Sequence, residues 1–224
     1  SRAPVPSTNA TIFGLIQEKI WREPFWLVIA VTFLNKTAGR SAVPVFWKLK
    51  EKYPTSEALA GADQADILDM VRHLGLQNQR SKRLIQIAKA WTTGSPVARK
   101  RYRTLNYPSQ GDGKASSTPN VIEDDAEECA GLLEIGNIPG CGQYAYDSWR
   151  IFCRDALRGV ADDYNGANAV AESFVPEWQR VLPDDKELRA CLRWMWLREG
   201  WIWDALTGEK RRATEEEMEK AVKG

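Results

Sequence analysis

The sequence predicts an all-α fold, and three observations indicate it. Apolar residues recur at helical spacing, as at Ile12, Leu15, Ile16 and Ile20. A turn built from proline and glycine lies within residues 135–147, directly before a new helical stretch. No stretch carries the alternation of apolar and polar residues that is typical of strands.

The expected helices follow from this spacing in chain order. The first covers residues 12–20, and the next contains the run 26–31, which is apolar on all sides, as in a central buried helix. Near the end of the chain, Thr214 and Glu217 form a capping box that opens a final helix. Between these, helices are expected over residues 41–53, 62–73, 79–91, 124–134, 143–158 and 184–196.

Two segments interrupt the helical pattern. Residues 94–119 carry Gly, Ser, Pro and charge without periodicity, which predicts a flexible insertion. A second insertion covers about residues 155–176. Since 224 residues are enough for one well-buried core, a single domain over 1–224 is expected.

The composition is that of a soluble globular protein, with 43% hydrophobic and 27% charged residues. The net charge of +1 is weak for a DNA-binding protein, so affinity for nucleic acid must come from local charge. Basic clusters occur at residues 99–103 and at Arg80, Lys82 and Arg83, whereas acidic residues gather at 123–128 and 215–217. Such runs are more often ordinary solvated surface than binding sites.

The cysteines predict neither a metal site nor an iron–sulfur cluster. Cys129, Cys141, Cys153 and Cys191 lie far apart, so reduced and mostly buried thiols are expected. The apolar run 25–34 is too short to span a bilayer. We therefore expect an intracellular protein, located in the nucleus, that does not bind membranes.

The turn at residues 135–147 predicts a grip on phosphate. Pro139 sets the entry to the turn, and Gly140 and Gly142 can adopt positive φ or allow another backbone to approach closely. Gln143 then opens a helix whose first N–H groups are free donors for a phosphate oxygen. The alternative is an ordinary corner between two helices.

Four sequence blocks carry a resemblance to a known family. They cover residues 33–54, 74–82, 140–153 and 181–196. In these blocks the chain resembles the helix-hairpin-helix DNA glycosylases, the HhH-GPD superfamily, from about residue 13 to residue 196. Within it, the chain looks most like the mismatch thymine/uracil glycosylases that carry a methyl-CpG-binding domain, as a fungal relative. The resemblance implies a two-lobed fold with the active-site cleft between the lobes. One lobe would be about residues 24–152, which hold the hairpin at 135–147, and the other about residues 1–22 with 153–224.

The resemblance also implies the catalytic residue. Cleavage of an N-glycosidic bond gives the sugar oxocarbenium character, so a carboxylate is needed near C1′. The family motif places it at Asp185, which would also be a helix N-cap. Asp184 is the first alternative, and Asp162 or Asp163 in the second insertion is the next.

The reaction type is implied by Tyr144. Bifunctional relatives carry a lysine at this position, whose amine attacks C1′ and leads to strand cleavage. A phenol cannot form a Schiff base, so a monofunctional enzyme that leaves an abasic site is expected. By resemblance, Gln17 and Ile16 line the base pocket with Tyr144. Glu187 flanks them where relatives have a basic residue.

Base flipping is implied by a third group of residues. A base must leave the duplex before its glycosidic bond can be reached. By resemblance, Lys36 fills the gap, and Leu74 and Leu76 wedge beside the orphaned guanine and present backbone carbonyls to it; helix-end packing is the alternative for both leucines. The further residues expected to contact DNA are Arg80, Lys82, Gly140, Gly142 and Gln143.

The expected partner is double-stranded DNA with G·T or G·U mismatches, and thymine, uracil or related 5-substituted uracils are the expected substrates of a monomeric enzyme. No cofactor is expected beyond a monovalent cation that the hairpin could accept. Two other functions stay open: a bifunctional glycosylase/lyase and a catalytically silent DNA-binding module. The base range, any CpG preference and the roles of the two insertions do not follow from the residues.

Overall fold

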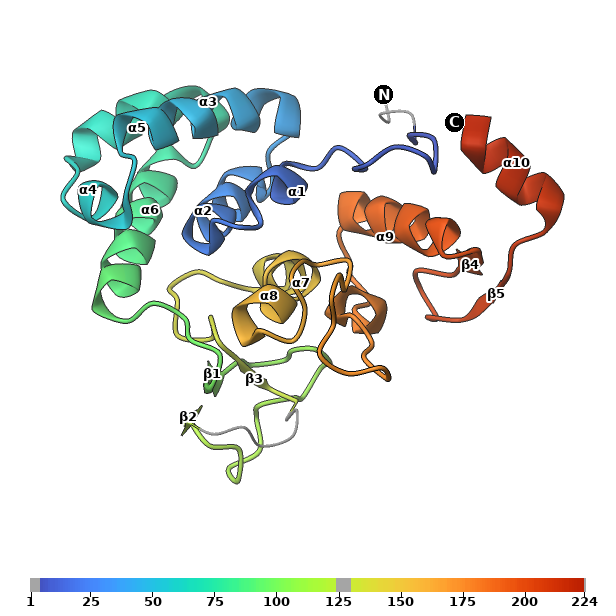
Figure 1. The fold of residues 1–224 in the computed structure, drawn as a ribbon. Coiled ribbons are helices and arrows are strands. Elements are labelled where there is room, and N and C mark those ends of the chain that lie inside the picture. The colour runs from blue at the N-terminus through green and yellow to red at the C-terminus, as the bar shows by residue number, and fades with distance from the viewer. Residues whose placement is uncertain (1–4, 124–129, 224) are drawn as a thin grey trace.

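The computed structural model describes residues 5–123 and 130–223, and these form a mostly helical fold, as the sequence predicts (Figure 1). Most expected helices are present with ends shifted by a few residues. The α-helices are α1 Ile16–Ile20, α2 Pro24–Leu34, α3 Gly39–Lys52, α4 Ser56–Ala60, α5 Gln64–Val71, α6 Gln77–Thr93, α7 Gln143–Phe152, α8 Arg154–Arg158, α9 Lys186–Arg198 and α10 Glu215–Lys223. Two 3₁₀ turns are η1 Arg72–Leu74 and η2 Glu177–Arg180.

Helix α2 is the centre of the core, as its apolar sequence predicts. Its residues from Phe25 to Val31 are buried, and the helix contacts α1, α3, α6 and α7. Pro24 occupies the first turn, where its missing N–H costs no hydrogen bond. The site residues therefore sit on elements that pack around one rigid helix.

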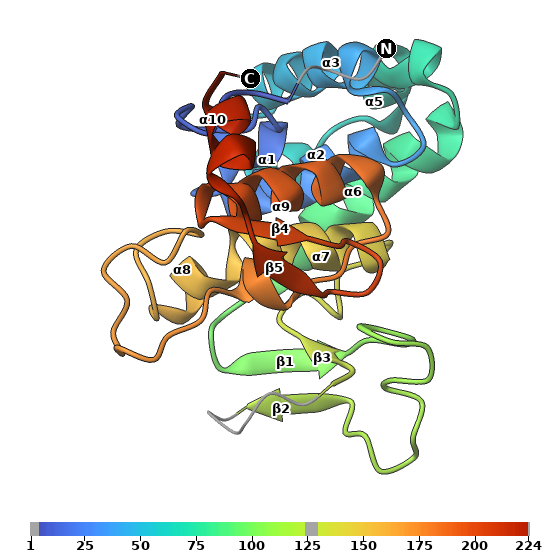
Figure 2. The same ribbon diagram turned by 90° about the vertical axis from the view of Figure 1, so that its right-hand side faces the viewer.

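The strands contradict the expectation that strand signals are absent. A three-stranded antiparallel sheet has the order β2 Val121–Glu123, β1 Lys100–Arg103, β3 Leu132–Leu133, and a separate hairpin pairs β4 Trp201–Trp203 with β5 Lys210–Arg212. Both views show the three-stranded sheet at the opposite end of the molecule from α3 (Figure 2). Because each strand has only two to four residues, none is long enough to show a reliable alternation.

The helix predicted over residues 124–134 is wrong in its described part. Leu132 and Leu133 are buried and pair with Arg103 and Tyr102 of β1. Residues 124–129 lie outside the described residues. The pairing partner is about 30 residues away in the chain, so local periodicity could not predict this strand.

The insertion at residues 94–119 is attached to the helical core. It contains β1, and Tyr107 is buried with its ring 5.0 Å from that of Tyr146 on α7. The backbone approaches closely as well, since a Cβ on Gly136 would collide with the Tyr102 carbonyl. The sheet thus supports the base of the hairpin.

A buried ionic cluster joins Glu134, directly before the hairpin, to Glu177, directly after the second insertion. The Arg154 guanidinium contacts Glu134 at 3.1 Å and Glu177 at 2.7 Å, and Arg150 donates to Glu177 at 2.8 Å. Burial opposes ionisation of Glu177, but the two guanidinium groups hold its pKa down at about 2. The Trp149 indole N–H donates to Glu134 at 3.1 Å.

The two ends of the described chain lie together (Figure 1). The Thr8 N–H donates to the Ala221 carbonyl at 2.9 Å. The predicted capping box is confirmed: the Thr214 N–H donates to the Glu217 carboxylate, and the Glu217 N–H donates to the Thr214 hydroxyl. None of the helices in residues 5–123 and 130–223 is long and apolar enough to cross a membrane.

Candidate active site

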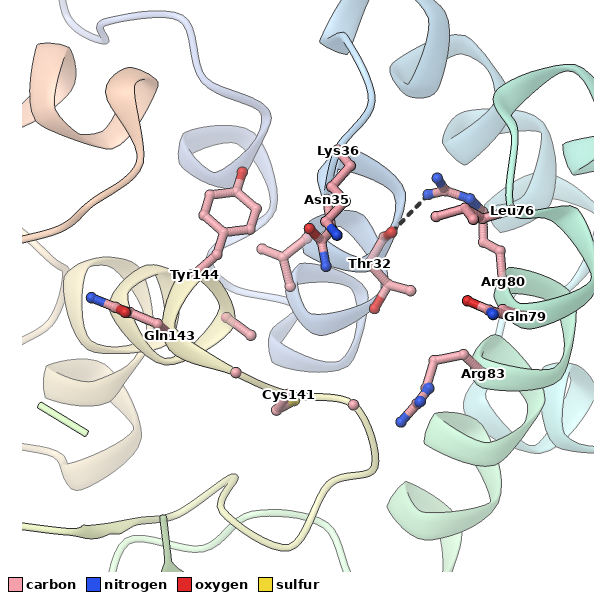
Figure 3. Close-up of a pocket in the computed structure, with 14 residues that line it drawn as sticks. Thr32, Asn35, Lys36, Leu76, Gln79, Arg80, Arg83, Cys141, Gln143 and Tyr144 are labelled. Carbon is pink, nitrogen blue, oxygen red and sulfur yellow. Dashed lines mark hydrogen bonds between the residues drawn. The ribbon is translucent and has the colours of Figure 1, made fainter. Parts of the chain in front are cut away.

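A groove of about 420 Å³ opens between the end of α2, the start of α6 and the hairpin before α7 (Figure 3). Tyr144 on α7 and Arg83 on α6 lie on opposite sides of it, with Lys36 between them. Of the predicted site residues, those that line this groove are Lys36, Leu76, Arg80, Gly140, Gly142, Gln143 and Tyr144.

Tyr144 is joined to the predicted base pocket by a hydrogen bond. The Gln17 amide Nε2 donates to the Tyr144 phenol oxygen at 3.0 Å. Gln17 is only 1% exposed, and its Oε1 is buried without a hydrogen-bond partner in the described part of the chain. A buried acceptor with no partner costs free energy unless a ligand supplies the donor.

Helix α1 holds Gln17 in place although it is short. The Glu18 carboxylate accepts three backbone N–H groups, from Phe13, Gly14 and Leu15, at 2.7–2.8 Å. Ile16 is buried beside Gln17. Hydrogen bonds within the protein therefore hold α1, and with it Gln17, in place.

Asp185 lies at the N-terminus of α9 and caps it. Its Oδ1 accepts the N–H groups of Glu187 at 2.9 Å and Leu188 at 3.0 Å, which leaves Oδ2 outside the cap. Burial raises the pKa of Tyr144, and the charges of Asp185 and Glu187 raise it further. Tyr144 is therefore a neutral phenol at physiological pH, close to the Asp185 carboxylate.

The alternative aspartates lie in less suitable places. Asp184 is exposed and forms an ion pair with Arg189 at 3.1 Å. Asp162 and Asp163 belong to an exposed turn, where Asp163 accepts the N–H groups of Asn165 and Ala167. Asp162 borders a different cavity, between α8 and the start of α2. The geometry thus favours Asp185.

Asp147 is a buried carboxyl that sequence reasoning did not single out. It lies one helical turn after Tyr144, is 3% exposed, and its Oδ1 accepts the Tyr107 hydroxyl at 2.9 Å. Its Oδ2 is buried without a hydrogen-bond partner among the described residues. Burial raises the pKa of Asp147 to about 7, and the charges of Asp184 and Asp185 add to the rise, while the Tyr107 hydrogen bond and Arg150 partly offset it. Its position in the 140–153 block was the one available signal.

The hairpin glycines differ from each other. Gly140 has φ +79°, as expected, and a side chain there would collide with that of Arg83. Gly142 is instead extended, with φ −143°, and open space surrounds the position of a Cβ. Gly142 is the N-cap of α7 and has no side chain that could accept a hydrogen bond from the first N–H groups of the helix. These N–H groups belong to residues that line the groove, and no capping side chain occupies them.

Lys36 and Leu76 share an uncommon backbone conformation. Their φ values are 58° and 52°, in the left-handed region that non-glycine residues rarely adopt. Both side chains are exposed in the groove. Leu74, in contrast, is 9% exposed and belongs to the hydrophobic core, so its side chain follows the alternative of helix-end packing.

The basic residues of α6 have separate positions. Arg80, expected to contact DNA, is only 5% exposed, and its guanidinium donates hydrogen bonds to other groups of the protein. Lys82 is exposed but does not line the groove. Arg83, which the sequence offered only as part of a basic cluster, lies against the hairpin and lines the groove. Glu187 is exposed at the start of α9.

The chain is similar in sequence to known DNA repair proteins. The family model for the HhH-GPD superfamily base excision DNA repair protein matches residues 29–223, which include the hairpin and Asp185. Over 101 residues the chain is 32% identical to a thymine-DNA glycosylase of Aeropyrum pernix. That alignment covers 43% of this chain and 45% of the relative, so the match spans less than half of the relative's length.

Proposed function

The chain belongs to the HhH-GPD superfamily of base excision DNA repair proteins, and from that premise we propose that it is a monofunctional DNA glycosylase. Its substrate would be thymine or uracil opposite guanine in double-stranded DNA, and its product would be an abasic site. The name of the similar protein from Aeropyrum pernix, thymine-DNA glycosylase, supports the choice of base.

One observation carries the proposal: Tyr144, which lines the groove, is hydrogen-bonded to Gln17 and lies close enough to Asp185 to feel the charge of its carboxylate. Tyr144 is a neutral phenol that can donate, and Gln17 Oε1 is a buried acceptor without a partner. Thymine and uracil present a carbonyl oxygen beside an N3–H group, which is the complementary pair. Cytosine has no hydrogen on N3, so it would leave the Gln17 acceptor unpaired.

The carboxylate of Asp185 then performs the chemistry. As the glycosidic bond breaks, positive charge develops at C1′, and a nearby carboxylate stabilises it or removes a proton from the attacking water. The α9 cap holds Asp185 through Oδ1, so Oδ2 is available to face the sugar without a change of rotamer. Such preorganisation means that little reorganisation is needed in the transition state.

The hairpin and the two left-handed residues would deliver the base. Uncapped N–H groups at the start of α7 suit a backbone phosphate, and Arg83 adds positive charge beside them. Lys36 and Leu76 are exposed where a flipped base would leave a gap. The carbonyls of the turn at Leu74 and Leu76 are proposed acceptors for guanine N1–H and N2–H, which adenine lacks in that arrangement.

A panel of duplexes tests the proposal. The protein is incubated with G·T, G·U, A·T, A·U and G·C duplexes, and products are resolved before and after hot alkali. Release from G·T and G·U alone, with strand breaks only after alkali and no adduct trapped by borohydride, is the expected result. Nicking without alkali together with a trapped adduct would establish the lyase alternative, and binding without base release would establish the silent module.

A further inference from the structure

Lys36 occupies a turn that normally requires glycine. Residues 34–37 form a type II β-turn, since the Thr37 N–H donates to the Leu34 carbonyl at 3.1 Å and Asn35 has φ −59° and ψ 116°. The third position of this turn needs positive φ, and here it is Lys36 with φ 58°. A lysine in that conformation persists only when its surroundings hold it there.

Leu76, directly before α6, is also a non-glycine residue with positive φ. It is the N-cap of α6, with φ 52° and ψ 30°, and its side chain is 55% exposed. Exposure of a large apolar side chain on a strained backbone gives no stability to the free protein. Lys36 and Leu76 are thus both held in unfavourable conformations that project them into the groove.

Arg80 contacts both of these places. Its Nη1 donates to the carbonyl of Thr32 at 2.7 Å (Figure 3) and to that of Phe33 at 2.8 Å, both at the end of α2. Its Nη2 donates to the Thr37 hydroxyl at 2.8 Å, directly after Lys36. The Arg80 backbone N–H donates to the Leu76 carbonyl at 2.8 Å, which is the first i→i−4 bond of α6 and does not depend on the arginine side chain. The Arg80 side chain therefore ties the first turn of α6, which begins after Leu76, to the turn that carries Lys36.

The Thr37 hydroxyl completes this link. It accepts from Arg80 and donates to the Asn35 carbonyl at 3.5 Å, so the two bonds span Lys36. A guanidinium presents its donors in a fixed plane and can reach these three acceptors at once, which the single ammonium of a lysine cannot do in the same geometry.

Stability alone does not explain a buried guanidinium at this place. Arg80 has no carboxylate partner among the described residues, and its Nε is buried without a hydrogen bond. Burying a cation in this way costs more than burying an apolar side chain of similar size. What the guanidinium supplies is a fixed distance between the turn and the start of α6.

We propose that Arg80 is a positioning residue that sets Lys36 and Leu76 at the spacing needed to enter DNA together. The inference rests on the proposed function, because it concerns how that enzyme opens a duplex. Arg80 does not contact DNA in this account; its side chain holds the turn through Thr37, and its place in the first turn of α6 fixes that turn relative to Leu76.

The experiment measures base flipping separately from chemistry. All variants are made in an Asp185→Asn background, which keeps an N-cap on α9 but removes the carboxylate. The probe is a G·T duplex with 2-aminopurine beside the thymine, whose fluorescence rises when the thymine leaves the stack. Binding to a matched duplex and the midpoint of thermal unfolding are recorded for each variant.

Thr37→Val and Thr37→Ser are the matched pair. Thr37→Val keeps the shape but removes the hydroxyl, and should lower the flipping constant by about fivefold or more, a size typical of residues that couple two elements. Thr37→Ser keeps the hydroxyl and should stay close to the parent. Arg80→Lys should resemble Thr37→Val, and matched-duplex binding should be unchanged in all three.

The outcomes separate this inference from the function on which it rests. If Thr37→Val and Arg80→Lys both flip the thymine as the parent does, while Lys36→Ala loses the signal, Arg80 is only structural and the inference is overturned. If Lys36→Ala also keeps the signal, Lys36 does not open the duplex and the inference is overturned while the proposed function stands. If the parent gives no signal and the chain with Asp185 intact releases no base from a G·T duplex, the proposed function fails too. Should Arg80→Lys not fold, the Thr37 pair alone decides.

Discussion

The Gln17 amide donates to the Tyr144 phenol oxygen across 3.0 Å and joins two helices that are 127 residues apart in the chain. Because this bond uses Nε2, the Gln17 Oε1 is left as a buried acceptor without a partner. In the proposed function, this pair would bind a base that offers one acceptor and one donor side by side.

Gln17→Leu should lower the single-turnover rate of base release by about 10- to 100-fold, since it removes a buried hydrogen-bonding group from the pocket. The loss should be similar for G·U and G·T duplexes, because both bases carry the same O and N3–H pair. Rapid-quench kinetics on the two duplexes measure it. A loss confined to one of the bases would show that Gln17 reads the 5-position and not N3–H.

Lys36→Gly and Lys36→Ala should differ in stability but not in function. Glycine relieves the left-handed conformation at φ 58°, whereas alanine retains it, so the glycine variant should be more stable by about 1 kcal/mol. Both should lose flipping and most turnover, because neither has a side chain that can fill the gap. Chemical denaturation and base release are the measurements; equal stability of the two variants would contradict the strain assigned to this turn.

Asp147→Asn should change how stability depends on pH. Burial raises the pKa of Asp147 to about 7, so its protonated form stabilises the native state. That contribution is fully present below the unfolded-state value of about 3.9 and is lost as the pH rises through about 7, at about 1.4 kcal/mol per unit of pH. The free energy of unfolding of the Asn variant, relative to that of the parent, should therefore rise between pH 4 and 7 and become constant above pH 7.

Tyr107→Phe is the control for this prediction. The Tyr107 hydroxyl donates to Asp147 and lowers its pKa, so its removal should move the transition to higher pH. Thermal unfolding from pH 4 to 9 follows all three proteins. Parallel curves for the parent and the Asn variant would mean that Asp147 does not titrate in this range.

Gly142→Val should weaken binding to every duplex by about tenfold while the protein still folds. The free protein has room for the side chain, and the extended φ of −143° suits any residue. The valine side chain would obstruct the approach of a phosphate to the first N–H groups of α7. Contacts to phosphate do not distinguish one DNA sequence from another, so matched and mismatched duplexes should be affected equally. Filter binding with matched and mismatched duplexes measures the affinity. If the variant binds DNA as tightly as the parent, the hairpin is an ordinary corner between helices and does not bind phosphate.

The helices and the site were predictable to different degrees. Periodicity located α2, α3, α6 and α9 because each repeats an apolar face over several turns. It missed β3, whose two leucines are buried through pairing with a strand some 30 residues earlier. Pairing between distant segments leaves no local pattern in so short a strand.

Motifs predicted which residues could meet, but not what each side chain does. The blocks around Tyr144 and Lys36 identified residues that line one groove. Arg80 was assigned to DNA from its charge, yet it is buried against carbonyls of α2 that are 47 and 48 residues away in the chain. Asp147 depends on Tyr107 from an insertion that no motif covers. The roles of Arg80 and Asp147 depend on their burial and on partners that are distant in the chain, and the sequence shows neither of these.

Base release by Asp185→Asn, compared with Asp184→Asn on one G·T duplex, tests the central claim most directly. Both substitutions remove one carboxylate, and the first retains the α9 cap. Asp185→Asn should lose about a thousandfold or more in single-turnover rate with mismatch binding nearly intact, because the carboxylate acts on transition-state charge. Asp184→Asn should stay within about threefold of the parent, because an exposed ion pair such as that with Arg189 contributes little. Full activity of Asp185→Asn, or an equal loss in both variants, would contradict the assignment.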